Sequence, residues 1–461
     1  MHPLIVSYSG IRGIVGESLT EDVVARFGRA FGSLVAQRHP SPTILLGRDT
    51  RPSGVELLRG AIRGLAPFGR LVDLGVVATP TLQFAMRALP AEAALCITAS
   101  HNPGEWNGLK LFLGPDHTVL DGEQIRELRA RVEVEERAPP DPPGSGAVPE
   151  RRHEEAIRRH VEAVRAQVEV DRVRARRFRV ALDSAGGAGQ EATEALLSAL
   201  GCAVVPVASR RESEPVAEHL SDLCRAVIEE RCDLGLAQDL DGDRLALVTE
   251  EGVAPGEEST LVLAIDHLLR RFPSGRRVVV KNVATSRAVD DVVARHGATL
   301  VETPVGEVNL SRALLREVRL GHLAFGGEGN GGVIFPRVSP GRDGLVGAAL
   351  VLESLAVEAV PLSRRLAALP RYHGRKVRAP LPAGAAGPAL LARVEAAFPG
   401  GEPSRVDGLK LRFPDGSWFV VRASNTEPIL RVVGESPDAG WLERTLARIE
   451  EIIARDVPAT T

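Results

Sequence analysis

The sequence predicts an α/β protein in which three α/β units precede a smaller α+β unit at the C-terminus. Apolar patterns of helical period alternate with short apolar strands over most of the chain. The 461 residues exceed what one core usually holds, and at roughly 100–200 residues per domain they suggest three or four domains. From about residue 370 the pattern changes to strands joined by short turns.

The first unit is expected to cover residues 1–145. Its helices are predicted at residues 21–37 and 54–65, and its strands at residues 43–46, 71–77 and 93–97. Residues 138–146 are rich in proline and glycine, a composition that resists packing into a core and suits a surface linker. We therefore place the first domain boundary in this segment.

Two further α/β units are expected over residues 146–250 and 251–368. In the second unit the predicted elements are strands at 178–182 and 203–207 and a helix that ends at 200. In the third they are strands at 278–280 and 299–303 and helices at 285–296 and 310–320. The glycine-rich turn at 183–189 lacks the spacing of a dinucleotide fingerprint, so nucleotide binding is not favoured.

The last unit, residues 369–461, is expected to be a small α+β domain. Its predicted elements are a helix at 389–398, strands at 409–413, 418–421 and 429–433, and an amphipathic helix at 440–455.

Composition bounds the environment and the partners. A formal net charge of −3, with 44% hydrophobic and 25% charged residues, fits a soluble globular protein and gives no electrostatic case for nucleic acid or an anionic membrane. No segment approaches the roughly 20 apolar residues that span a bilayer, and no charged leader precedes the chain, so we expect a cytoplasmic protein. The four cysteines are scattered and are expected to be free thiols: Cys96, Cys202, Cys224 and Cys232.

The first candidate site is the stretch Thr98-Ala99-Ser100-His101-Asn102-Pro103, which follows an apolar strand. It places one hydroxyl, that of Ser100, among polar and turn-forming residues, where the hydroxyl can carry phosphate. Taken alone, the stretch could also be only a turn.

The second candidate is Asp239-Leu240-Asp241-Gly242-Asp243-Arg244, which offers three carboxylates at alternate positions. With Glu250 these acids fall at positions 1, 3, 5 and 12 of a calcium-binding EF-hand. However, Arg244 stands where that loop needs glycine, and the flanking runs are strand-like rather than helical. A small octahedral cation that also takes a phosphate oxygen fits better, so we expect Mg²⁺. A solvated acidic turn is the alternative.

The third candidate lies near the C-terminus. Ser424-Asn425-Thr426 follows Arg422 by two residues and offers hydroxyl and amide donors beside a forked guanidinium, a combination suited to a second phosphate. The alternative is that these residues only cap a turn.

Five motifs stand in a characteristic order: Ser9-Gly10-Ile11-Arg12-Gly13, the serine stretch, the aspartate stretch, Gly326-Gly327-Glu328-Gly329-Asn330, and residues 422–428. By these motifs the chain resembles, over nearly its whole length, the α-D-phosphohexomutases, the family of phosphoglucomutases, phosphomannomutases and phosphoglucosamine mutases. The resemblance implies three related α/β domains with mixed sheets flanked by helices, plus a distinct fourth domain.

The resemblance also implies an activity. It is that of an isomerase, an intramolecular phosphotransferase that interconverts hexose 1-phosphates and hexose 6-phosphates through phosphoserine and a sugar 1,6-bisphosphate. Mannose and glucose phosphates are the first expectation, and glucosamine phosphate is the alternative. A sugar-phosphate phosphatase and a non-catalytic sugar-phosphate binder are less favoured. The expected partners are small hexose phosphates, and the expected state is a monomer or a homodimer.

Residue roles carried over from the family are as follows. Ser100 becomes phosphorylated, while His101 and Lys110 exchange protons with a sugar hydroxyl or neutralise the phosphate, and Arg12 matches an active-site arginine. The metal ligands are Ser100, Asp239, Asp241 and Asp243. Substrate contacts are expected from Arg244, Gly306, Glu307, Glu328, Asn330, Arg422, Ser424, Asn425 and Thr426.

Two of these substrate contacts leave questions open. Family members commonly have serine and histidine where this chain has Asn330 and Gly332, which leaves the sugar contacts beyond Glu328 open. Glu307 could pair with a protonated amine of glucosamine phosphate, or it could simply be an acid placed favourably at a helix N-terminus.

Overall fold

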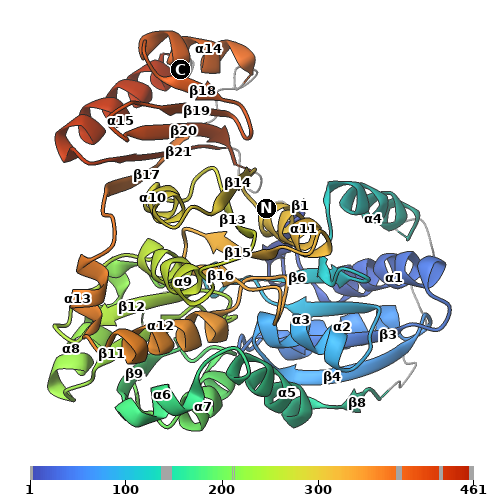
Figure 1. The fold of residues 1–461 in the computed structure, drawn as a ribbon. Coiled ribbons are helices and arrows are strands. Elements are labelled where there is room, and N and C mark those ends of the chain that lie inside the picture. The colour runs from blue at the N-terminus through green and yellow to red at the C-terminus, as the bar shows by residue number, and fades with distance from the viewer. Residues whose placement is uncertain are drawn as a thin grey trace.

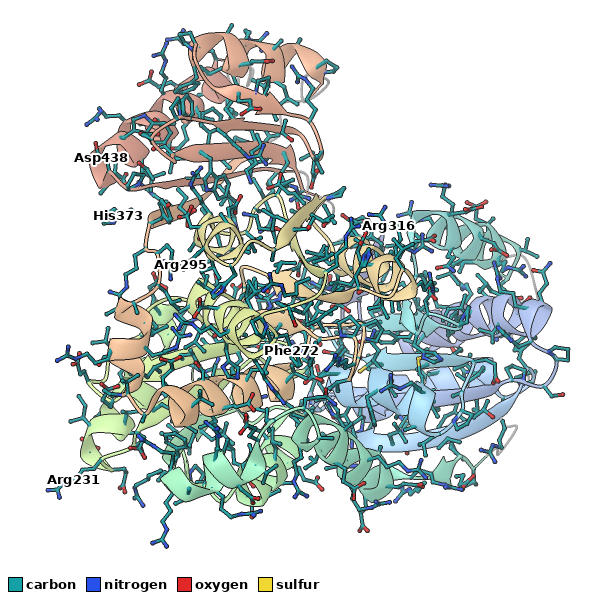
Figure 2. The ribbon with its side chains drawn as sticks, in the orientation of Figure 1. Arg231, Phe272, Arg295, Arg316, His373 and Asp438 are labelled. Atoms are coloured by element: carbon teal, nitrogen blue, oxygen red, sulfur yellow. The ribbon has the colours of Figure 1, made fainter. Side chains whose placement is uncertain are left out.

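The computed structural model describes residues 4–135, 148–209, 211, 213–380, 387–424 and 429–455. The predicted linker at 138–146 and the candidate residues Asn425 and Thr426 lie outside these ranges. Three α/β units lie together, and the C-terminal unit stands apart from them at the top of Figure 1. Side chains fill the spaces between sheets and helices, whereas surface residues such as Arg231 point outward (Figure 2).

The first unit is built on a mixed eight-stranded sheet of order β1-β2-β6-β5-β3-β4-β8, with β7 paired to β6. Its strands are β1 Ile5–Ser7, β2 Gly10–Ile14, β3 Thr43–Arg48, β4 Arg70–Val76, β5 Ala93–Ile97, β6 Trp106–Leu113, β7 Thr118–Val119 and β8 Glu150–Arg151. Its helices are α1 Glu21–Arg38, α2 Gly54–Leu65, α3 Thr79–Ala88 and α4 Gly122–Glu135. Strand β8 lies beyond residue 145 in the sequence, yet it pairs in parallel with β4.

The second and third units each have a four-stranded sheet, of order β10-β9-β11-β12 and β14-β13-β15-β16. The strands are β9 Arg179–Asp183, β10 Ala203–Pro206, β11 Leu234–Gln238, β12 Leu245–Thr249, β13 Arg277–Asn282, β14 Thr299–Thr303, β15 Leu323–Glu328 and β16 Gly332–Ile334. The helices of these units are α5 His153–Arg165, α6 Val170–Arg176, α7 Gln190–Ala199, α8 Ser221–Glu229, α9 Glu258–Arg271, α10 Ala288–Arg295, α11 Glu307–Arg319, α12 Gly344–Glu358 and α13 Leu362–Ala367, with a short 3₁₀ helix at Ala217–His219.

The three units share one strand pattern. In each, the first strand pairs in parallel with the second and the third, and the third pairs antiparallel with the fourth: β3, β4, β5 and β6, then β9 to β12, then β13 to β16. The turn between third and fourth strand therefore occupies an equivalent place in each unit. It carries the serine stretch in the first unit, the aspartate stretch in the second and residues 329–331 in the third.

The C-terminal unit has an antiparallel five-stranded sheet of order β17-β21-β20-β19-β18. Its elements are β17 His373–Pro380, α14 Pro388–Ala397, β18 Glu402–Ser404, β19 Leu409–Arg412, β20 Trp418–Ala423, β21 Ile429–Ser436 and α15 Ala439–Ala454. The fold class expected from the sequence is thereby confirmed. Among the described residues, no helix is both long and apolar enough to cross a membrane.

Two predicted helix starts were wrong by three residues, each for a local reason. Helix α11 begins at Glu307 rather than 310, because Gly306 has φ 126° and lets the chain turn into the helix three residues earlier. Helix α10 begins at Ala288 rather than 285, because Thr285 belongs to a turn in which the Asn282 carboxamide oxygen accepts from the Thr285 hydroxyl at 3.0 Å.

Candidate active site

The serine stretch is held in a strained conformation by a buried arginine. Ser100 has φ 53°, in the left-handed region that non-glycine residues rarely occupy. The Arg51 guanidinium donates to the carbonyl oxygens of Ser100, Asn102 and Pro103 at 2.8, 2.8 and 3.0 Å. Arg51 in turn pairs with Asp49 at 3.1 Å. The role of Arg51 in this structure is therefore to shape the loop that presents Ser100.

The Ser100 hydroxyl lies against the second unit. Its Oγ donates to Asp239 Oδ2 at 3.2 Å and is 3.4 Å from His101 Nδ1. Ser100 is 2% exposed and Asp239 is fully buried. The structure thus brings together the two motifs that the sequence separates by more than a hundred residues.

Carboxylate oxygens of the three aspartates, Asp239, Asp241 and Asp243, lie within 4.8 Å of one another, and all three residues are fully buried. Among the described residues, Oδ1 of Asp241 and Oδ1 of Asp243 have no hydrogen-bond partner. Leaving a buried carboxylate oxygen unpaired is costly, and clustered carboxylate oxygens are the ligands that Mg²⁺ prefers. The residues present therefore fit a divalent cation.

Lys110 lies inside this acidic cluster. Its Nζ donates to Asp241 Oδ2 at 2.5 Å and to Asp243 Oδ2 at 2.8 Å. Burial alone would lower the pKa of Lys110, but the two carboxylates outweigh burial and raise it. Lys110 therefore stays protonated, and of its two expected roles the geometry favours charge neutralisation over proton abstraction.

His101 and Arg244 are hydrogen-bonded to each other beside the Ser100 hydroxyl. Arg244 Nη2 donates to His101 Nδ1 at 2.9 Å, and Nη1 donates to Glu214 at 2.8 Å. The positive charge of Arg244, together with burial and the charge of Arg12, holds the pKa of His101 well below its usual range. The imidazole is therefore neutral at physiological pH. Arg12 joins the same site, donating to Asn102 Oδ1 at 2.6 Å, and burial lowers its pKa to about 10.

Arg342, which the sequence reasoning missed, connects the aspartate cluster to the sugar-binding positions. Its guanidinium donates to Asp243 at 2.8 Å, to Glu307 at 2.9 Å and to Glu328 at 2.9 Å. The side chain is only 11% exposed. The available signal was the segment Pro340-Gly341-Arg342-Asp343-Gly344, in which an arginine stands between two glycines directly before a helix.

The expected sugar contacts gather around Glu328. Besides Arg342, Glu328 accepts from Asn282 Nδ2 at 2.9 Å and from Asn330 Nδ2 at 3.4 Å. Glu307 lies in the first turn of α11, and burial raises its pKa although Arg342 opposes the shift. Both carboxylates are therefore already paired with a cation in this structure.

Tyr8, a second residue missed from the sequence, closes the site from the N-terminal side. Its hydroxyl donates to the Val305 carbonyl oxygen at 3.1 Å. A Cβ atom at Gly306 would lie 2.6 Å from the Tyr8 ring, so glycine is needed there for the close approach as well as for its φ.

Arg422 reaches the same loop from the C-terminal unit. Its Nε donates to Asp407 Oδ2 at 2.8 Å, and that oxygen also accepts from the Val305 backbone N–H at 3.0 Å. Arg422 is 4% exposed, and its Nη2 has no hydrogen-bond partner within the described residues. Ser424 Oγ accepts from Arg431 Nε at 3.5 Å. One arm of the expected phosphate clamp is thus buried and available.

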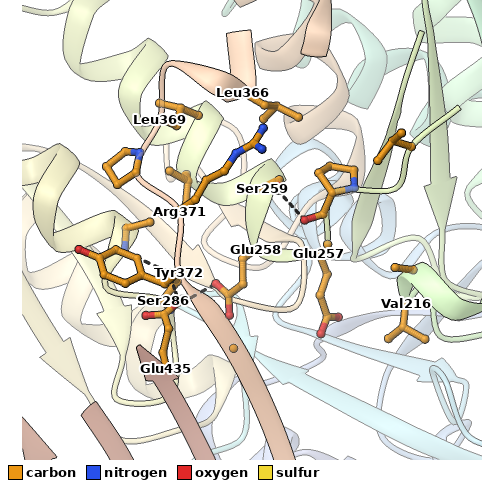
Figure 3. Close-up of a pocket in the computed structure, with 18 of the residues that line it drawn as sticks. Val216, Glu257, Glu258, Ser259, Ser286, Leu366, Leu369, Arg371, Tyr372 and Glu435 are labelled. Carbon is orange, nitrogen blue, oxygen red and sulfur yellow. Dashed lines mark hydrogen bonds between the residues drawn. The ribbon is translucent and has the colours of Figure 1, made fainter. Parts of the chain in front are cut away.

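A cavity of about 900 Å³ lies between the second and third units, the segment leading to β17 and the C-terminal sheet (Figure 3). Its lining includes Glu257, Glu258, Ser286, Lys376 and Glu435, but none of the predicted site residues. The cavity is therefore not the predicted catalytic cleft.

Comparisons with known proteins agree with this geometry. Family profiles described as phosphoglucomutase/phosphomannomutase match consecutive parts of the chain: alpha/beta/alpha domain I at residues 4–138, domain II at 158–252, domain III at 256–372 and the C-terminal domain at 377–452. The four-domain architecture is that of an α-D-phosphohexomutase. The chain belongs to the phosphoglucomutase/phosphomannomutase family, and it is an enzyme of the isomerase class.

Individual relatives cover almost the whole chain. A phosphoglucomutase/phosphomannomutase of Thermococcus kodakarensis is 36% identical over 96% of this chain and 98% of its own length. A phosphoglucosamine/phosphogalactosamine mutase of Sulfurisphaera tokodaii is 29% identical over 96% and 98%. The crystal structure of a phosphoglucomutase/phosphomannomutase family protein from Burkholderia thailandensis superposes with a TM-score of 0.82 at 26% identity, covering 99% and 98%.

Proposed function

We propose that this enzyme interconverts hexose 1-phosphates and hexose 6-phosphates through a phosphate carried on Ser100 and a sugar 1,6-bisphosphate. The observation that supports this best is the placement of Ser100 Oγ, 3.2 Å from Asp239, in a buried cluster where two carboxylate oxygens have no partner in the described parts of the chain. A phosphoserine at this point would lie beside Arg244 and Lys110. Phosphoryl transfer depends chiefly on positioning and on charge stabilisation, and both are provided here.

In the transfer step a sugar hydroxyl oxygen attacks the phosphorus of phosphorylated Ser100. The bond from phosphorus to Ser100 Oγ breaks as the bond to the sugar oxygen forms, and the proton of the sugar hydroxyl ends on Ser100 Oγ. Neutral His101, whose Nδ1 lies 3.4 Å from that Oγ, is the group placed to relay the proton once Nδ1 no longer accepts from Arg244. Mg²⁺, held by the three aspartates and a phosphate oxygen on Ser100, would neutralise charge on the transferring group.

The second half of the reaction uses the same residues. The bisphosphate exchanges its two ends, so that its other phosphate comes to Ser100 and is returned there. We propose that the distal phosphate is bound by Arg422, Ser424, Asn425 and Thr426, and that Glu328 and Asn330 contact the sugar ring. The Nη2 of Arg422, which has no partner among the residues that the structure describes, supports the first assignment, because a guanidinium fork suits phosphate.

For the sugar, we propose mannose and glucose phosphates rather than glucosamine phosphate. Glu307 is paired with Arg342 at 2.9 Å, so its carboxylate is not free to receive a protonated amine. Glucosamine phosphate is the alternative, in line with the name of the Sulfurisphaera tokodaii relative. The rates for mannose, glucose, glucosamine and N-acetylglucosamine phosphates should be compared in wild type and Glu307→Gln. A glucosamine preference that falls in the variant would overturn this assignment.

The central test is the fate of the phosphate on Ser100. The intact mass of the isolated protein should fall by one phosphate on phosphatase treatment, and Ser100→Ala should lose both that phosphate and mutase activity. Ser363→Ala, a serine outside the site, is the control. Near wild-type activity in Ser100→Ala would rule out the storage role, and release of free phosphate in place of the isomer would identify a phosphatase.

We also propose domains at residues 1–145, 146–250, 251–368 and 369–461. The match limits of the four family profiles support this division, although β8 adds to the first sheet from beyond residue 145. A cytoplasmic location is proposed as well, supported by the four cysteines, all of which are free thiols.

A further inference from the structure

Behind Arg342, a buried histidine links three helices. His160 on α5 is fully buried, and its Nε2 is 2.8 Å from Asp343 Oδ2 at the start of α12. Its Nδ1 is 3.0 Å from the hydroxyl oxygen of Thr81 on α3. The imidazole stacks on Phe84 with ring centres 5.1 Å apart. Helix α5 packs against both α3 and α12.

Asp343 is held by hydrogen bonds at both carboxylate oxygens and at its backbone N–H. Because a carboxylate only accepts hydrogen bonds, Nε2 of His160 carries the proton in this pair. The other oxygen of Asp343 accepts from the backbone N–H groups of Leu345 and Val346 at 2.9 and 3.2 Å, which caps α12. The Asp343 N–H donates to the Val333 carbonyl oxygen at 2.8 Å. Asp343 is 1% exposed, so breaking any of these bonds would leave a buried polar group unpaired.

The segment that contains Arg342 also packs closely between α3 and the aspartate stretch, residues 239–244. A Cβ atom at Gly341 would lie 1.9 Å from Gln83 Oε1 on α3, and one at Gly344 would lie 2.8 Å from the Gly242 carbonyl oxygen. Helix α3 also contacts the aspartate stretch, because the Thr79 hydroxyl donates to Asp241 at 2.8 Å. One helix thus aligns both the Arg342 segment and the proposed metal ligands.

We propose that His160 is a positioning residue for the mutase reaction. By holding Asp343, it fixes the neighbouring Arg342 guanidinium, which pairs at once with one metal-site carboxylate and two sugar-site carboxylates. Loss of the His160 contact would let that guanidinium shift and would disturb both ends of the substrate together. The inference rests on the proposed function, since the positioned groups are those assigned to the transfer.

The first test compares two histidine substitutions. His160→Phe keeps the stacking on Phe84 but removes both hydrogen bonds. It should lower kcat/KM for glucose 1-phosphate about 10- to 100-fold, with a rise in KM, as expected for misplacement of a substrate. The control is His267→Phe, which removes a similar buried contact, between His267 Nε2 and Glu353 at 2.6 Å. Both variants should lower the melting temperature, but only His160→Phe should change kcat/KM by more than about 3-fold.

The second test asks whether His160 acts through Arg342. In an Arg342→Ala background, adding His160→Phe should lower kcat/KM by less than about 3-fold, because residues that act through one another are not additive. Where turnover is too slow for kcat/KM to be measured, the Kd of glucose 6-phosphate is compared instead, by calorimetry. If His160→Phe does not fold, Thr81→Val should give a smaller loss with the same dependence on Arg342.

Two results would overturn the proposal: losses that multiply fully with Arg342→Ala, or kinetics in His160→Phe that match those of His267→Phe. Failure of the proposed function is distinguishable, since wild type would then convert none of the hexose phosphates while the calorimetric comparison still tests His160.

Discussion

Two groups of acidic side chains, one in the aspartate cluster and one at the interdomain cavity, differ in how their carboxylate oxygens are hydrogen-bonded. In the aspartate cluster, Oδ1 of Asp241 and of Asp243 lacks a partner among the described residues. At the interdomain cavity, Glu435 accepts from the Ser286 hydroxyl at 2.5 Å, the Arg287 N–H at 2.7 Å and Trp418 Nε1 at 2.8 Å. Of the described residues, only the three aspartates form a group that could hold a metal ion.

The difference extends to charge. Burial opposes ionisation of Asp241, yet Lys110 and further hydrogen bonds pull its pKa below the usual range. The Glu258 carboxylate lies against Gly329, in the turn between β15 and β16, and accepts from the Ser286 N–H at 3.2 Å (Figure 3). Burial raises the pKa of Glu258 to about 8, with Lys376 opposing the shift. Similar acids therefore differ in protonation. Asp241 and Asp243 have lowered pKa values and stay ionised, whereas burial and the two neighbouring carboxylates raise the pKa of Asp239 well above its usual range. Glu258 keeps a proton at neutral pH.

The largest expected effect comes from Asp241 in the aspartate cluster. Asp241→Asn should lower kcat by about 100-fold or more, because it removes one charge from the proposed metal site and from the contact with Lys110. Glu257→Gln, at the interdomain cavity, is the matched control and should leave kcat within about 3-fold of wild type. Steady-state kinetics over a range of Mg²⁺ concentrations provide the measurement. An unchanged dependence on Mg²⁺ in Asp241→Asn would count against the ligand set.

A smaller effect is expected in metal binding without turnover. Saturating Mg²⁺ should raise the melting temperature of wild type by about 2–5 °C, since a ligand that binds only the folded state stabilises it. The shift should vanish in Asp241→Asn and persist in Glu257→Gln. Calorimetric melting with and without EDTA measures it, and a shift lost equally in both variants would remove the distinction between the two acid groups.

Much of the fold was predictable because its elements carry local patterns. Helix α2 and strand β14 were predicted with the observed limits, since each has a clear apolar pattern bounded by turn residues. Helix α12 was missed because it is buried at every position from Gly344 to Leu355, and so has no polar face to reveal its period. Strand β17 was missed because it is largely exposed and charged, without the alternation of a half-buried strand.

The site was predictable only where one segment holds several functional groups. The serine stretch predicts a phosphate-carrying hydroxyl and the aspartate stretch predicts a cation site, each from six consecutive residues. Tyr8 could not be found that way, and the glycine-flanked segment around Arg342 gives only a weak signal, since the significance of both depends on partners that the fold brings from distant parts of the chain. For Glu307 the sequence left two interpretations open, a contact to a protonated amine or an acid at a helix N-terminus. The residue does begin α11, and its pairing with Arg342 could not be seen in the sequence.

The smallest expected effect concerns the proton on Glu258. Its pKa of about 8 in the folded protein lies above the value near 4.5 expected when the chain unfolds. Between these values the folded state binds a proton that the unfolded state has lost, so the free energy of unfolding should decrease as pH rises from about 5 to about 8 and then level off. Glu258→Gln removes this term because the amide cannot ionise. The variant should match wild type near pH 5 and exceed its stability at pH 8–9 by about 1–3 kcal/mol. Melting temperatures in steps of pH, with the exposed substitution Glu123→Gln as control, measure the difference. A gap between variant and wild type that does not widen with pH would show that Glu258 is ionised like Asp241, and the contrast between the two acid groups would fail.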